Sequence, residues 1–223
     1  MKKTLVISSL LLFSIVTFNL KAQKITVESG YINPGRFGAS TSTTYLNGIQ
    51  LGAAVDFDIK YNFGLHTGVL YTAPYGYNEQ LYPSATANYF TLGLFTDIPL
   101  RLTYSLPASE TFKFFVFTGP NLNIGIVQKQ IINSTVNTIP SRNIDLYSTS
   151  SLNRYNIQLG IGGGMQWSQF ILKGGYDLGL NNLNKLSNGN QYQNSWNISF
   201  AYEFATFNCC NKTAKTESTV ISK

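Results

Sequence analysis

Apolar and polar residues alternate along residues 88–104, NYFTLGLFTDIPLRLTY, instead of following the 3.6-residue spacing of a helix. One face of this segment carries leucine, isoleucine and aromatic side chains. The other face carries Asp97 and Arg101 together with glycine, threonine and Pro99. Because successive side chains of a strand point to opposite faces, the pattern predicts one β-strand with an apolar face and a polar face.

Seven further segments show the same alternation, so the sequence predicts eight strands. No Asp, Glu, Lys or Arg falls on any of the apolar faces. The predicted strands cover residues 24–31, 47–60, 62–71, 88–104, 112–126, 155–167, 170–180 and 192–204.

The connections between these strands come in two alternating sizes. They are short after the second, fourth and sixth strands, and long and polar after the first, third, fifth and seventh. Short turns on one side, long loops on the other and aromatic residues near both strand ends are typical of outer-membrane barrels. A sheet in lipid must also close, because every backbone group needs a partner. We therefore expect an all-β, eight-stranded antiparallel up-and-down transmembrane β-barrel over residues 23–204. Its outer aromatic girdle would contain Tyr31, Tyr71, Tyr89 and Tyr192.

The two ends of the chain differ from this pattern. Residues 1–22 begin with two lysines, continue with a short apolar stretch and end at Ala22, which is the layout of a signal peptide. Cleavage there would lower the formal charge of the protein from +6 to +3. Residues 205–223 form a polar C-terminal tail in which Cys209 and Cys210 are adjacent, and neighbouring cysteines rarely bridge each other.

The polar faces are expected to line the inside of the barrel. Eight strands enclose a space just wide enough for side chains, so we expect a filled lumen in which charges of opposite sign pair. Pro99 removes a hydrogen-bond donor from its strand, which predicts a β-bulge there, near the periplasmic rim. The residues expected in this lumen network are Glu28, Asp56, Asp58, His66, Asp97, Arg101, Lys113, Lys173, Asp177 and Glu203.

Three features of the sequence could carry chemistry. The chain has a single histidine, His66, and its spacing places no serine or acid beside it, so we expect a hydrogen-bonded lumen residue and not a catalytic base. The glycines in Gly160–Gly164 lack the context of a phosphate-binding loop and are better explained as space for bulky neighbours. Asp56 and Asp58 are too few for a calcium site, and we expect them to pair with a lumen Lys or Arg.

Several segments give the chain a family resemblance. The leader ending KAQ, the strand FTDIPLRLTY, the strand FVFTGPNLNIG and the ending SFAYEF together resemble the PorT-like outer-membrane β-barrel domain family. The resemblance covers roughly residues 23–204. It implies an eight-stranded barrel in the outer membrane of a diderm bacterium, and some members of the family are tied to protein secretion machinery.

The sequence therefore favours a non-enzymatic barrel of the cell outer membrane, in contact with lipid and with long extracellular loops for a partner. The alternatives are an accessory subunit of a secretion complex and a lipid-modifying enzyme. A diffusion pore is disfavoured, because eight strands leave no open channel. No cofactor, metal site or clustered basic surface for nucleic acid is predicted.

Overall fold

The computed structural model describes residues 21–38, 41–82, 85–134, 142–148, 152–185 and 189–207. The predicted signal peptide, apart from Lys21 and Ala22, and most of the polar tail lie outside these residues, whereas strands are described from Lys21 to Phe207. Among the described residues, no helix is long and apolar enough to cross a bilayer. The described residues form the strands β1 (Lys21–Gly38), β2 (Thr41–Tyr45), β3 (Asn47–Asp58), β4 (Phe63–Tyr82), β5 (Ala85–Pro107), β6 (Phe112–Ser134), β7 (Arg142–Asp145), β8 (Tyr155–Trp167), β9 (Phe170–Gly179) and β10 (Gln191–Phe207).

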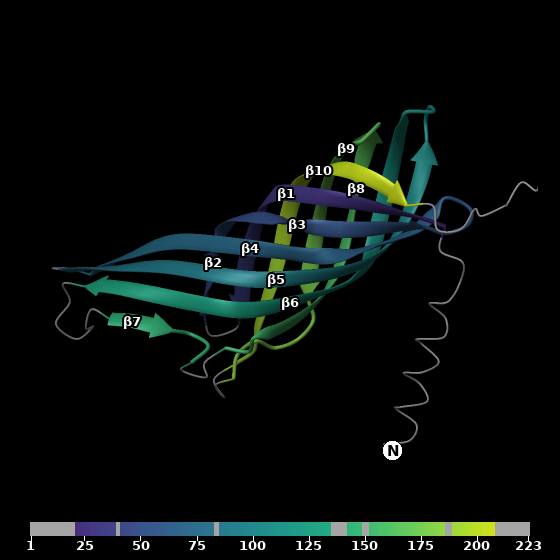
Figure 1. Ribbon diagram of the computed structural model, residues 1–223. Helices are drawn as coiled ribbons and strands as arrows, with labels where there is room; N and C mark the ends of the chain where they lie inside the picture. The colour runs from purple at the N-terminus through teal and green to yellow at the C-terminus, as the bar shows by residue number, and fades with distance from the viewer. Residues whose placement is uncertain are drawn as a thin grey trace, which may run out of the picture.

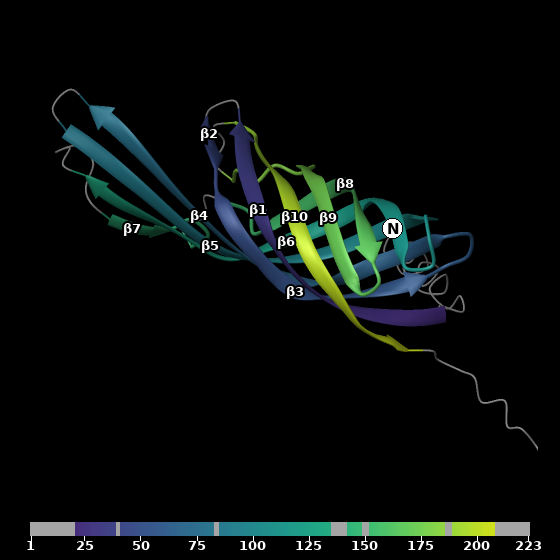
Figure 2. The same ribbon diagram turned by 90° about the horizontal axis from the view of Figure 1, so that it is seen from above.

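Eight of these strands close into a ring, as the sequence predicted. Its order is β1-β3-β4-β5-β6-β8-β9-β10, and β10 pairs with β1 to complete the barrel (Figures 1 and 2). Neighbouring strands in the ring are antiparallel. The short strands β2 and β7 lie outside the ring and pair with β1 and β6. The predicted all-β, eight-stranded antiparallel barrel is therefore confirmed.

Side chains in the ring alternate between the inside and the outside. On β5, Leu100 and Leu102 face outward and are nearly half exposed, whereas Asp97 and Arg101 face inward and are only 3% and 6% exposed. A strand between water and a core would bury its apolar face, but this barrel does the opposite. Such an arrangement is stable only if lipid covers the outside.

The short connections lie where the sequence placed them. They consist of residues 59–62, 108–111 and 168–169, all at one end of the barrel. At the other end, strands run on into the predicted long loops, which are therefore shorter than expected: β1 continues to Gly38 and pairs with β2, and β6 continues to Ser134. After the third strand of the ring, β4 and β5 continue as a paired hairpin until only residues 83–84 separate them. Pro74, Gly76 and the polar residues that follow are typical of loops, so the sequence pattern hid this extension.

The extended ends of β4, β5 and β6 form an arm on one side of the barrel. The strand β7 pairs with β6 at this end. Figures 1 and 2 show the three long strands running on past their neighbours, with β7 beside them. We call residues 74–82 of β4, 85–94 of β5, 126–134 of β6 and β7 the arm.

The predicted β-bulge at Pro99 is wrong. Pro99 lies in the middle of the barrel and is buried, and β5 keeps one register with β6 from Pro99 through Leu102. Leu100 and Arg101 have no partner in the β5–β6 ladder, but the register is the same on both sides of them. The register shifts instead between Leu94 and Phe95, opposite the chain around Ile126. A missing N–H removes one rung of the ladder, but it does not require an inserted residue.

The glycines of β8 provide space for aromatic rings inside the barrel. A Cβ at Gly164 would lie 2.6 Å from the ring of Phe115, and a Cβ at Gly162 would collide with the ring of Phe117. Both rings come from β6, the neighbouring strand. The interpretation of these glycines as space for bulky neighbours is confirmed, and a phosphate-binding role is not needed to explain them.

Candidate functional site: a polar lumen closed toward one end

All ten residues of the predicted lumen network line one cavity of about 360 Å³. The cavity reaches the rim with the short turns, where Asn62 and Pro107 contribute to its lining, and ends in the barrel near Asp97 and Asn121. The expectation of a completely filled lumen is therefore wrong for this half of the barrel. We call this open half the vestibule. It is lined by Glu28, Asp56, Asp58, His66, Asp97, Arg101, Lys113, Lys173, Asp177 and Glu203, together with Lys24 and further polar and apolar residues.

The rim of the vestibule carries partly exposed charges. Lys24 Nζ lies 2.7 Å from a carboxylate oxygen of Asp58, so one of the two paired aspartates has the expected lysine partner. Gln166 donates a hydrogen bond of 2.9 Å to Glu203. Lys113, which is partly buried, has no ion pair with any described residue. Its charge is attracted by the nearby carboxylates of Asp58, Glu203 and Asp56.

His66 connects three charged side chains deeper in the vestibule. Its Nδ1 lies 2.8 Å from Asp56, and its Nε2 lies 3.2 Å from Lys173 Nζ and 3.4 Å from Glu28. Lys173 also donates a 2.6 Å hydrogen bond to Glu28. Both ring nitrogens are thus engaged, as expected for a structural lumen histidine.

The expectation that no acid lies beside His66 is wrong. Asp56 is its direct partner across the β3–β4 ladder, and Glu28 reaches it from β1. Spacing along one strand cannot show such neighbours, because they come from other strands. Asp56 pairs with a histidine and not with the expected Lys or Arg.

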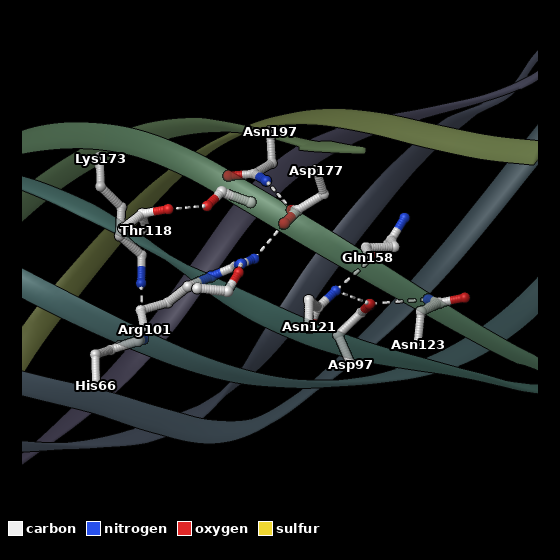
Figure 3. A network of polar contacts seen from close by, with 12 residues as sticks. His66, Asp97, Arg101, Thr118, Asn121, Asn123, Gln158, Lys173, Asp177 and Asn197 are labelled. Carbon is white, nitrogen blue, oxygen red and sulfur yellow. Dashed lines mark hydrogen bonds and ion pairs between the residues drawn. The ribbon is translucent and has the colours of Figure 1, made fainter. Parts of the chain in front are cut away.

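An ion pair crosses the middle of the barrel between Arg101 and Asp177 (Figure 3). Arg101 also donates to the backbone carbonyl of Gly119, and Asn197 donates to Asp177 at 3.3 Å. Both charged side chains are only 7% exposed. A Cβ at Gly160 would collide with both of them, which explains the glycine at this position of β8.

Asp97 is held by neutral donors and not by a cation. Thr72 Oγ1 and Asn123 donate to its carboxylate at 2.8 Å and Asn121 at 3.0 Å, and Asn121 continues the network to Gln158 (Figure 3). Several hydrogen bonds to a carboxylate stabilise its charge. Thr72 and Gln158 are almost completely inaccessible, so this polar layer fills the cross-section above the vestibule.

An apolar cluster closes the other end of the lumen. Phe95 of β5 packs with Tyr147, Leu152 and Leu183, which come from the connections between β6 and β8 and between β9 and β10. Burial raises the pKa of Tyr147, and the nearby guanidinium groups of Arg36 and Arg154 oppose that shift. The sequence does not predict this closure, because the pattern of the connections gives no sign that their side chains fold into the barrel.

The described residues contain no group of three or more His, Cys, Asp or Glu side chains that could hold a metal ion.

The lumen has three levels along the barrel axis. The vestibule is open at the short-turn end, the Asp97 layer fills the middle, and the Phe95 cluster covers the opposite mouth. This arrangement opposes passage of solutes from one end to the other.

Residues 15–185 match the family described as "Outer membrane protein beta-barrel domain". A comparison with curated protein sequences gave no significant match. Among solved structures, Neisserial surface protein A is 11% identical with a TM-score of 0.42 over 81% of this chain and 97% of that one. Ail, the attachment invasion locus protein of Yersinia pestis, is 14% identical with a TM-score of 0.38 over 82% and 99% of the two chains. The outer membrane enzyme PagL is 12% identical with a TM-score of 0.42 over 80% and 99%. These similarities concern the fold alone.

Proposed function

Because the chain belongs to the outer membrane protein beta-barrel domain family, we propose that it is a non-enzymatic surface protein whose extracellular segments contact a partner. It would be exported by the signal peptide of residues 1–22. In outer-membrane barrels the short turns face the periplasm and the longer connections face outward. The arm and the connections near Tyr147 and Leu183 then lie on the cell surface, and the vestibule opens to the periplasm.

The closed lumen is the observation that supports this proposal. In the part of the chain that the structure describes, the Asp97 layer and the Phe95 cluster separate the extracellular side from the vestibule, which argues against a diffusion pore. The extracellular side nevertheless carries more ordered chain than is needed to connect the strands, including the hairpin of β4 and β5 and the strand β7. A protein that only spans the membrane would not need this extension.

The position of His66 supports a non-enzymatic role. A hydrolase acting on lipid headgroups would need a base on the outer surface near the extracellular rim. His66 instead lies inside the barrel, 7% exposed, with Asp56 and Lys173 at its two nitrogens. Unaltered lipid A in cells that overproduce the protein is the expected result, and new lipid A species would refute a non-enzymatic role.

A second candidate function is that of an accessory subunit in an outer-membrane secretion complex, as in the PorT-like family. The vestibule favours it, because Lys113 and Glu203 present charged groups toward the periplasm, where such a complex would dock. The first candidate uses the extracellular side of the barrel, and the second uses the periplasmic rim. Contacts made at the two ends in living cells can therefore distinguish them.

The test places a photo-crosslinking amino acid at one site on each side of the barrel. Lys185, exposed in the connection between β9 and β10, probes the extracellular side, and Lys113 probes the vestibule. Adducts from Lys185 with a surface ligand support the first function. Adducts from Lys113 with secretion components, without any from Lys185, support the second. In planar bilayers the purified protein should show no ohmic conductance, and a stable conductance would refute the closed lumen.

A further inference from the structure

The outward apolar face of the barrel is taller on one side than on the other. On β9 it runs from Phe170 to Leu180, which is ten residue steps. On β4 it runs from Phe63 to Tyr77, which is fourteen steps, and β5 has an equal run from Tyr104 to Phe90. All of these runs start at the rim with the short turns.

The difference can be converted into height above the periplasmic rim. Strands rise about 3.3 Å per residue and tilt by about 40° in such barrels, so ten steps span about 25 Å and fourteen about 35 Å. The lipid-facing band of an outer-membrane barrel is about 25 Å tall. The outward face of β4 and β5 therefore stays apolar for about 10 Å beyond the height at which the band on β9 ends.

The residues in this additional height form one exposed patch at the base of the arm. Tyr77 is 60% exposed, Tyr75 is 49% exposed and Leu92 is 45% exposed, and none of the patch residues is charged. We call this surface the upper patch, and it consists of Tyr75, Tyr77, Phe90, Leu92, Leu94 and Ile126.

The opposite face of the same strands is covered by the protein itself. A Cβ at Gly76 would collide with Leu46, which is buried, and Phe95 lies beneath Tyr147 in the apolar cluster. Thr72 and Gln128 on the inward side have no accessible surface. The exposed apolar surface thus lies on the outward face, where it continues the lipid-facing band past Thr96 of β5 and beside the exposed Lys129 of β6, which pairs with Leu92.

We propose that the upper patch is a contact surface for outer-leaflet lipid, and that the barrel sits tilted so that its β4–β6 side is embedded more deeply. Continuity with the lipid-facing band identifies the occupant, because the same strands present the same face to lipid just below. Tyr75 and Tyr77 fit this position, since tyrosine places its ring in the apolar layer and its hydroxyl among the headgroups. The tip of the arm then emerges above the lipid and leaves the surface contacts of the proposed function in place.

The experiment measures the surroundings of a nitroxide label at each site. Single cysteines replace Tyr77 and Leu92 in a Cys209→Ser, Cys210→Ser chain refolded into vesicles of phosphatidylethanolamine and lipopolysaccharide. Dissolved oxygen reports lipid, and a water-soluble nickel chelate reports water. Leu178→Cys on the outward face of β9 is the lipid control, and Asn182→Cys, exposed above it, is the aqueous control.

Labels at Tyr77 and Leu92 should match the Leu178 label, with more frequent collisions with oxygen than with nickel. A nickel-dominated signal like that of Asn182 would overturn the proposal and show that water covers the patch. Exclusion of both reagents, with spin–spin broadening that increases with protein density, would also overturn it and indicate a second copy of the chain. If Tyr77→Cys does not give the heat-modifiable folded species, Tyr75→Cys on the same face replaces it.

Discussion

Breaking the ion pair between Arg101 and Asp177 should be among the most destabilising single changes in this barrel. The substitution Asp177→Asn keeps the size of the side chain and an acceptor oxygen, so it removes a charge without leaving a cavity. Arg101 cannot lose its proton and would remain inside the barrel without its carboxylate partner. Both side chains are only 7% exposed, and although they line the inner part of the vestibule, little water can replace the lost partner. Removing one partner of a buried pair costs about 3–5 kcal/mol of stability.

The rim pair between Lys24 and Asp58 is the matched control. Its side chains are 20% and 49% exposed, and water therefore screens the interaction. Asp58→Asn makes the same chemical change as Asp177→Asn but should cost less than about 1 kcal/mol. The difference in stability loss between the two substitutions mainly reports burial, because the chemical change and the assay are the same.

Each variant is refolded into lipid vesicles, and the folded fraction is followed through a urea titration by heat-modifiable gel mobility. A double-mutant cycle completes the measurement. Arg101→Met combined with Asp177→Asn should lose less stability than the sum of the single losses, by about 2 kcal/mol, because no unpaired charge remains. The reasoning is refuted if Asp177→Asn loses no more stability than Asp58→Asn, or if the single effects simply add.

The remaining predictions concern the lipid face, the glycines and the leader. Leu159→Arg places a charge in lipid near the middle of β8 and should cost about 2–4 kcal/mol in the same urea assay, and a cost near zero would contradict the outward assignment. Gly162→Ala should lower stability because its Cβ meets an aromatic ring, whereas Gly174→Ala, with no neighbouring atom nearer than 3.5 Å, should be tolerated. Equal losses would show that the space at Gly162 is not needed. The intact mass of protein from membranes should place the mature N-terminus at or near Gln23, and retention of Met1 would contradict the signal peptide.

Local alternation was enough to predict the eight strands of the ring and their two faces. In the segment around Asp97 and Arg101, the two-residue period placed both charges inside and the leucines outside, as the structure shows. The short turns were equally clear, because they interrupt the alternation with a few polar residues. The long hairpin of β4 and β5 was missed, since Pro74 and Gly76 are typical of loops but remain within a paired strand here.

The sequence by itself determined which side chains face inward, because that depends only on the parity of positions along each strand. The closed sheet decided which of the inward-facing residues contact one another. Asp97 and Arg101 lie four residues apart on β5, yet Arg101 pairs with Asp177 of β9 and Asp97 is held by amides of β6. Tyr147 and Leu183 reach Phe95 from connections with no regular period. The register between strands and the path of the connections set these contacts, and neither can be predicted from the alternation within a single strand.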